Sequence, residues 1–237
     1  MARLAVLSDL HANLTALQAV LEDLERRGLT QVLVLGDLVG YLTRPNQVVA
    51  LVEKRGWPCL AGNYDQAVLA GGEAGIEQFL KPGIGPEPRA VFSWTERRVN
   101  QATRAFLAGL PGQLSLELDG CGLLAVHGSP ASVRQYVHAD HPQDELEAWL
   151  EQAGAQVLCL GHTHVPFVRS VSGGLVVNPG SVGKSKDGDP SASYALIELG
   201  RRPRAQIVRL GWDLEEEARL LREAGLGARV DRLRQGV

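Results

Sequence analysis

The sequence predicts an α/β fold, and two features of its pattern carry that prediction. Short, uninterrupted apolar runs recur along the 237 residues, and helical segments separate the early ones. Apolar runs without alternation are typical of strands buried on both faces, and strand–helix alternation is typical of α/β sheets. Because no stretch has the composition of a linker, we expect a single domain over residues 1–237.

Five of the apolar runs lead directly into polar clusters that contain aspartate, asparagine or histidine. The runs cover residues 3–7, 32–35, 59–61, 123–126 and 157–160. In open α/β sheets, ligands gather beyond the carboxyl ends of the strands. We therefore expect the five clusters, although distant in sequence, to meet at one site.

Four segments have helical signals, and they cover residues 14–24, 45–54, 144–152 and 213–223. Asn13 or Thr15 is the expected N-cap of the first, and Gly28 its C-terminal stop. Pro45 suits the first position of the second helix. Glu216 completes a capping box at the start of the last one.

Two further stretches depart from the early pattern. After residue 165, short strand-like runs are separated by Gly, Pro, Asn and Asp, which favours an antiparallel second sheet made of residues 165–171, 175–177, 193–199 and 205–210. The stretch from Gly71 to Pro88 is rich in glycine and proline and has weak periodicity. It predicts a loop or lid that follows Asn63.

Composition excludes several classes of function. The formal net charge is -3, so the chain lacks the basic field of a duplex nucleic-acid binder. No apolar stretch approaches the roughly 20 residues of a membrane span, and the N-terminal run is too short for a signal peptide. The three cysteines lie in apolar runs and read as buried small residues. We expect a cytoplasmic protein with no membrane partner, and the oligomeric state stays open.

The polar clusters hold oxygen and nitrogen ligands but no thiolate. Such a set suits Mn, Fe, Zn, Co or Ni, and its size exceeds one tetrahedral site but suits two ions that share a carboxylate. In extended backbone, residues two apart point to the same side, so Asp9 with His11, and His162 with His164, can each reach one centre. The candidate metal ligands are Asp9, His11, Asp37, Asn63, His127, His162 and His164.

Together the clusters resemble the motifs of the calcineurin-like metallophosphoesterases: Asp9-Leu10-His11, Gly36-Asp37, Gly62-Asn63-Tyr64-Asp65, His127-Gly128 and Gly161-His162-Thr163-His164. The resemblance spans roughly residues 4–199 and is strongest to small bacterial and archaeal phosphodiesterases and diadenosine-tetraphosphatase-like proteins. It implies a four-layer α/β/β/α sandwich. It also implies one ion held by Asp9, His11, Asp37 and His164, and a second held by Asp37, Asn63, His127 and His162.

The chain departs from the family at its fourth motif, which usually reads Gly-Asn-His-Asp. Tyr64 stands where the family has a histidine that protonates the leaving group or holds the phosphate. A phenol with a pKa of about 10 is a poorer proton donor than imidazolium, but it can donate a hydrogen bond to a phosphoryl oxygen. Asp65 either orients Tyr64 or caps a turn. The candidate catalytic residues are Asp37, Asn63, Tyr64 and Asp65.

Three residues are candidates for contact with substrate: Asn13, Tyr41 and Tyr64. Asn13 has the alternative role of helix N-cap, and Tyr41 that of a packing aromatic. Arg134 is another possible phosphate contact, for which a solvated surface position is the favoured alternative.

The resemblance implies an enzyme that hydrolyses phosphodiester bonds of small or nucleotide substrates, with phosphomonoesters also open. The cofactors would be two divalent ions (Mn, Fe, Ni, Co or Zn), and a hydroxide bridging them would attack phosphorus. The alternatives are a serine/threonine protein phosphatase, a dinucleoside polyphosphate hydrolase, and a non-catalytic metal-binding scaffold. Loss of ligands would favour the scaffold, and all seven positions are filled.

Overall fold

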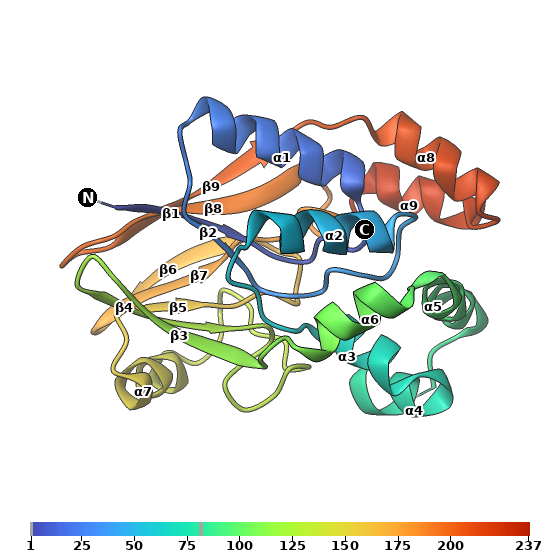
Figure 1. Cartoon of the computed structure of the whole chain (residues 1–237). Coiled ribbons are helices and arrows are strands. Elements are labelled where there is room, and N and C mark those ends of the chain that lie inside the picture. The colour runs from blue at the N-terminus through green and yellow to red at the C-terminus, as the bar shows by residue number, and fades with distance from the viewer. Residues whose placement is uncertain (1, 81–82) are drawn as a thin grey trace.

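The computed structural model describes residues 2–80 and 83–237 (Figure 1). Two β-sheets lie face to face, and helices cover their outer faces, which confirms the four-layer α/β/β/α sandwich. The first sheet has the order β2 (Val32–Val34), β1 (Arg3–Leu7), β8 (Ala192–Glu198), β9 (Arg204–Leu210). The second has the order β3 (Gln113–Leu118), β4 (Cys121–Val126), β5 (Val157–Cys159), β7 (Gly174–Asn178), β6 (Phe167–Val171).

Strand β1 explains why the sequence shows continuous apolar runs. Leu4 and Val6 belong to the apolar cluster between the two sheets. Ala5 and Leu7 point the other way, into the cluster beneath α1 (Leu14–Arg26) and α2 (Pro45–Arg55). Because successive side chains of a strand face opposite sides, a strand covered on both sides must be apolar throughout. On the outer face of the second sheet, α7 (Gln143–Ala153) forms the fourth layer.

The four strands after residue 165 do not form a sheet of their own, as the sequence had suggested. Strands β6 and β7 join the second sheet, where β7 runs parallel to β5. Strands β8 and β9 join the first sheet, where β8 runs antiparallel to β1. The turn residues do mark the two antiparallel pairs β6–β7 and β8–β9, but turn chemistry is local and does not encode which sheet a pair joins.

The segment from Gly71 to Pro88 is mainly helical rather than a loop. It contains α4 (Gly72–Phe79) and the start of α5 (Pro86–Arg98), and residues 81 and 82 of the predicted loop lie outside the described residues. Gly71 precedes the first helix, and Pro86 opens the second. The glycine and proline that suggested a loop therefore mark helix ends, where both residue types are favoured.

The other predicted helices are confirmed to within a few residues. Asn13 caps α1 by accepting a hydrogen bond from the backbone N–H of Ala16, and Asp213 caps α8 (Leu214–Glu223) by accepting from that of Glu216. The remaining helical elements are α3 (Asn63–Ala70), α6 (Gln101–Ala108), η1 (Gly227–Arg229) and α9 (Val230–Gln235).

Two further expectations can be compared with the structure. All three cysteines are buried and free, as expected of small apolar residues. Among the described residues, every helix is too short or too polar to cross a membrane.

Candidate metal centre

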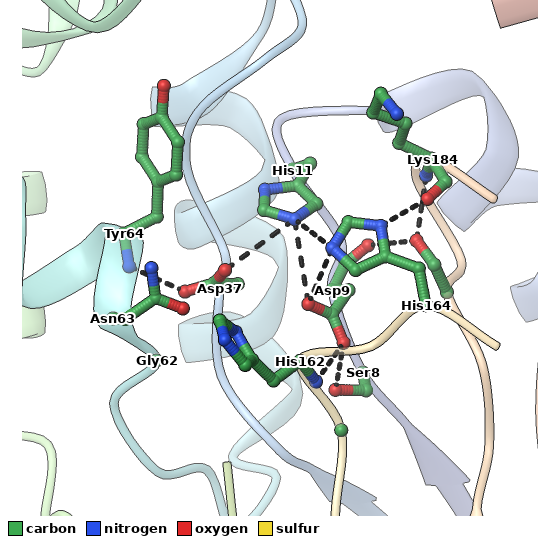
Figure 2. Close-up of polar contacts among 12 residues, drawn as sticks. Ser8, Asp9, His11, Asp37, Gly62, Asn63, Tyr64, His162, His164 and Lys184 are labelled. Carbon is green, nitrogen blue, oxygen red and sulfur yellow. Dashed lines mark hydrogen bonds and ion pairs between the residues drawn. The ribbon is translucent and has the colours of Figure 1, made fainter. Parts of the chain in front are cut away.

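The five polar clusters meet at one place, as predicted, although the run at residues 59–61 forms only an isolated bridge between Cys59 and Val34 and not a strand. Figure 2 shows side chains from the turns after β1, β2 and β5 and from the start of α3 facing one centre. All seven candidate ligands are buried, with at most 7% of any residue exposed. Side chains this polar are rarely buried unless they are paired or bind a metal.

Asp9, His11 and His164 form the first group. The Nε2 atoms of the two histidines are 3.2 Å apart, and Asp9 Oδ1 lies 3.1 Å from His164 Nε2 and 3.6 Å from His11 Nε2. Two nitrogens bound to one ion at the usual metal–nitrogen distance lie roughly 3.0–3.4 Å apart. The three ligand atoms therefore already have the spacing that a shared ion requires.

Backbone carbonyls fix the orientation of three of the histidine rings. His11 Nδ1 lies 3.0 Å from the carbonyl oxygen of Val39, His127 Nδ1 lies 2.7 Å from that of Leu35, and His164 Nδ1 contacts that of Lys184. Since a carbonyl only accepts, each Nδ1 carries the proton, and Nε2 is the atom that each ring turns to the centre. The Nε2 atoms of His11 and His164, 3.2 Å apart, therefore need a proton or a metal ion between them.

The second group contains Asp37, Asn63, His127 and His162. Asp37 Oδ2 lies 3.5 Å from His127 Nε2 and 3.6 Å from His11 Nε2, so its carboxylate stands between the two groups. Asn63 Oδ1 lies 3.0 Å from His127 Nε2. Asp9 and His127 also fall, with Asp37, into a set whose ligand atoms all lie within 4.8 Å of one another.

Two of these buried atoms, Asp9 Oδ1 and His162 Nε2, have no hydrogen-bond partner within the part of the chain that is described. Leaving a buried polar atom unsatisfied costs about 1–3 kcal/mol. A divalent cation bound at each group would satisfy the two atoms, one cation for Asp9 Oδ1 and another for His162 Nε2. The residues present therefore fit divalent metal ions.

The pKa values of the two carboxyls and of two histidines favour a cation at this centre, whereas His127 takes up a proton itself: against the effect of burial, Asp37 and Asp9 raise its pKa to about 9. Burial opposes ionisation of Asp9 and Asp37, yet the neighbouring histidines hold the pKa of both carboxyls below its usual value. Burial, with the charge of His127, lowers the pKa of His162 to about 4, and burial, with the charge of Lys186, lowers that of His164 to about 3. Both rings are therefore neutral at pH 7, the state in which imidazole binds metals.

The backbone conformation of the ligand loops differs from the extended conformation predicted for Asp9 with His11 and for His162 with His164. Instead of extended backbone, left-handed φ angles occur at Asp9 (54°), His11 (44°), Asp37 (53°), His162 (65°) and His164 (60°). Such conformations cost about 1–3 kcal/mol each and are typical of functional sites. Bonds between the two loops hold them, since the N–H of Asp9 donates to the carbonyl of Gly36 and that of His11 to the carbonyl of Asp37.

Asp65 caps a turn, which is one of its two predicted roles. Its carboxylate accepts hydrogen bonds from the backbone N–H groups of Leu38, Val39 and Gly62 at 3.0–3.2 Å. These bonds join the loop of Asp37 to the start of α3. Burial and the nearby charge of Asp37 raise the pKa of Asp65 to about 7. Asp65 thus acts on the centre by positioning the loops, not by orienting the Tyr64 hydroxyl.

Gly62 allows the closest approach in this region. A Cβ atom at this position would lie 2.0 Å from Asp37 Oδ1. The same carboxylate oxygen accepts a 2.7 Å hydrogen bond from the backbone N–H of Tyr64. Any larger residue would therefore displace the carboxylate that stands between the two groups.

Tyr64 lies beside the centre, but its hydroxyl is at the far end of the ring from Asp37 (Figure 2). Its ring lies across Gly40, where a Cβ atom would approach Tyr64 Cδ1 to 2.4 Å. Burial, with a contribution from Tyr41, raises the pKa of Tyr64 well above its usual value. Tyr64 therefore keeps its proton at neutral pH and can donate a hydrogen bond.

The other two candidates for substrate contact differ in position. Tyr41 lines the pocket over the centre, and its ring centroid is 4.5 Å from that of His11. Asn13 is fully buried, and both ends of its amide are engaged, Oδ1 with the N–H of Ala16 and Nδ2 with the carbonyl of Gly183 at 2.8 Å. Its position supports the alternative role of helix N-cap.

A pocket with a volume of about 610 Å³ opens over the candidate ligands. Sequence reasoning missed Lys186 and Tyr136, which line it, and favoured a solvated position for Arg134, which lines it too. None of the three stands in a recognisable motif or beside a ligand in sequence.

Comparisons with known proteins identify the family. Residues 2–202 match the calcineurin-like phosphoesterase superfamily domain. The chain belongs to this superfamily. It is therefore a metallophosphoesterase, a hydrolase that acts on phosphoester bonds, and its family uses divalent metal ions.

Two of the similar proteins cover nearly the whole chain at about the same identity. An uncharacterized protein from Methanocaldococcus jannaschii is 30% identical over 230 residues, which are 90% of this chain and 89% of that protein. The crystal structure of a metallophosphoesterase from Sphaerobacter thermophilus is 31% identical, with a TM-score of 0.79 and coverage of 100% and 99%. A hypothetical protein from Pyrococcus horikoshii shares the fold, with a TM-score of 0.86 at 22% identity and coverage of 100% and 98%.

Proposed function

We propose that this metallophosphoesterase hydrolyses phosphodiester bonds of small or nucleotide substrates with two divalent ions. Asp9, His11, Asp37 and His164 would hold one ion, and Asp37, Asn63, His127 and His162 the other. The observation that carries the proposal is the position of Asp37 Oδ2, at 3.5–3.6 Å from a histidine Nε2 of each group. A carboxylate between two ligand groups is what a shared ligand requires.

When bound, two such ions supply a water that is deprotonated near neutral pH and neutralise charge on the phosphoryl oxygens. The protein's part is to fix the ligands. The hydroxyl of Ser8 donates to Asp9 Oδ2 at 2.6 Å, and the N–H of His162 donates to the same oxygen at 3.1 Å, which leaves Oδ1 for an ion. In the same way, the N–H of Tyr64 holds Asp37 Oδ1 and leaves Oδ2.

Two residues of the pocket are placed to bind the phosphate itself. Lys186 lines the pocket, and no ion pair of its ammonium group is found within the described residues. Burial lowers the pKa of Lys186, and a phosphoryl oxygen would give its charged form a partner. Tyr64 also lines the pocket, and its protonated hydroxyl can donate a hydrogen bond to substrate. A volume of about 610 Å³ suits a small ester rather than a folded protein segment, which favours this function over a protein phosphatase.

The test is a substrate panel assayed with the metal-free protein and after addition of Mn, Ni, Co, Zn or Mg. The panel contains bis(4-nitrophenyl) phosphate, 4-nitrophenyl phosphate, a phosphoserine peptide and diadenosine tetraphosphate. The proposal predicts metal-dependent hydrolysis, with the diester cleaved fastest. Preference for the phosphopeptide would favour the protein phosphatase, and inactivity on every ester with every metal would favour the scaffold.

A further inference from the structure

We propose that the outer part of the pocket binds a planar aromatic ring against Tyr136, so that the preferred substrate is a phosphate ester of a nucleoside. This inference rests on the proposed function, because it names the substrate class of the same site. It adds a ring subsite, made of Tyr136 with the side chains of Leu80, Ile84 and Pro88, to the phosphate site at the metal centre.

Tyr136 is the first observation. It is 55% exposed, one of three exposed large hydrophobic residues among those described, and it lines the pocket. Its ring centroid lies 4.3 Å from that of His162, with the planes tilted by 36°, and His138 stacks on it at 6.1 Å. The ring is therefore held beside a candidate metal ligand while more than half of the residue stays open to a ligand.

The chemistry of the neighbouring residues is the second observation. Leu80 follows α4, Ile84 precedes α5, and Pro88 lies in the first turn of α5; all three are half-buried and line the same pocket as Tyr136. Apolar side chains cannot bind a phosphate, so they suit an uncharged part of the substrate. An aromatic ring uses both the apolar surface and the π-face of a tyrosine, and stacking of a base on an aromatic side chain is worth about 1–3 kcal/mol.

The charges in the pocket are the third observation. Lys186 and Arg134 line it together with the metal-facing side chains, so cationic and apolar groups share one cavity. Arg134 also donates to the carbonyl oxygens of Glu77 and Gln78, at the end of α4, and so joins this helix to the loop that carries Tyr136. A ligand that matches this cavity carries a phosphate and a planar ring on one small scaffold. A nucleoside phosphate has both.

The test compares two ligands that differ only in the base. They are the methylenephosphonate analogues of adenosine 5′-phosphate and of ribose 5-phosphate, whose carbon–phosphorus bonds resist hydrolysis. Dissociation constants are measured by calorimetry on the Mn²⁺-loaded protein. We expect the adenosine analogue to bind about tenfold more tightly, within the range that stacking of one base supplies. Tyr136→Phe should keep this ratio, whereas Tyr136→Leu, which keeps apolar contact with His162, should reduce it to about twofold or less.

Equal binding of the two ligands by the wild-type protein would overturn the ring subsite. A ratio that survives Tyr136→Leu would also overturn it, since the base would then bind elsewhere. Metal content is measured for each variant, and Tyr136→Leu with full metal content keeps the comparison valid. Because neither ligand is cleaved, failure of this inference is separate from failure of the proposed function, which would appear as inactivity of the wild-type protein on the substrate panel.

Discussion

The site has two parts that are built in different ways. The floor is made of the seven candidate metal ligands, of which Asp37, Asn63, His162 and His164 line the pocket, and the wall is made of Leu80, Ile84, Pro88 and Tyr136. Every residue of the floor is at most 7% exposed, and left-handed backbone and inter-loop hydrogen bonds fix most of them. The wall is half-buried or exposed and belongs to helix ends and a loop. The difference suggests that the floor sets the chemistry and the wall sets the choice of substrate.

The C-terminal elements contact Tyr41 and the start of α5, the helix that carries Pro88 of the wall. The matched family domain ends at residue 202, so α8, η1 and α9 lie beyond it. Arg229 from η1 pairs with Glu87 at the start of α5 at 2.8 Å, and its guanidinium lies 4.9 Å from the centre of the Tyr41 ring. Residues outside the family domain therefore contact Tyr41, which lines the pocket, and the helix that carries Pro88.

The largest effect is expected at the centre of the floor. Asp37→Asn removes the charge shared by the two ligand groups and should lower kcat for bis(4-nitrophenyl) phosphate by about a thousandfold, as expected from loss of several kcal/mol of stabilisation. Metal content should fall as well. Asp140→Asn, in an exposed loop, is the matched control. Near wild-type activity of Asp37→Asn would show that Asp37 is not a shared ligand.

A smaller effect on activity is expected from substitution of Lys186, which lines the pocket but belongs to neither the floor nor the wall. Lys186→Gln should lower kcat/KM by roughly ten- to a hundredfold, the range for loss of one hydrogen bond to a charged group. Metal content should not change, and Lys186→Arg should recover part of the activity. Lys54→Gln, on the exposed surface of α2, is the control. Loss of bound metal in Lys186→Gln would mean that the lysine supports the floor instead of the phosphate.

Tyr64→Phe separates leaving-group chemistry from binding. Removing a hydrogen-bond donor of about 1 kcal/mol should slow diesters with alkyl leaving groups by about fivefold. Diesters with a 4-nitrophenyl leaving group, which need no protonation, should change less. The ratio of kcat/KM for the two classes is the measurement. If both classes slow by the same factor, Tyr64 has no role specific to the leaving group.

The smallest effect on ligand binding is expected from loss of the Glu87–Arg229 ion pair, at the start of the helix that carries Pro88. Glu87→Gln removes the ion pairs of Glu87 with the buried Arg229 and the exposed Arg232, and a loss of about 1 kcal/mol would lower Tm by roughly 2–4 °C. Binding of the adenosine phosphonate should weaken while metal content stays the same. Glu215→Gln, which breaks the exposed pair with Arg234, should change Tm but not ligand binding. Equal ligand binding by both variants would show that this pair does not support the wall.

The sequence predicts the floor well and the wall poorly, for a physical reason. All the ligands except Asn63 follow a buried strand, and Asn63 follows a short run bridged to β2, so local pattern and sheet topology together bring them to one edge. Tyr136 and Lys186 lie in irregular segments whose path depends on long-range packing, and no periodicity marks them. The strand partners after residue 165 were mispredicted for the same reason. Cytoplasmic location, the single domain and the absence of duplex nucleic-acid binding stay predictions.

The most direct measurement is the number of divalent ions bound per chain. Metal-free protein is titrated with Mn²⁺, bound metal is counted by elemental analysis, and hydrolysis of bis(4-nitrophenyl) phosphate is followed at each point. We predict that two ions bind per chain and that activity rises with occupancy of both. Saturation at one ion with full activity would contradict the claim that the two ligand groups around Asp37 form a dinuclear centre.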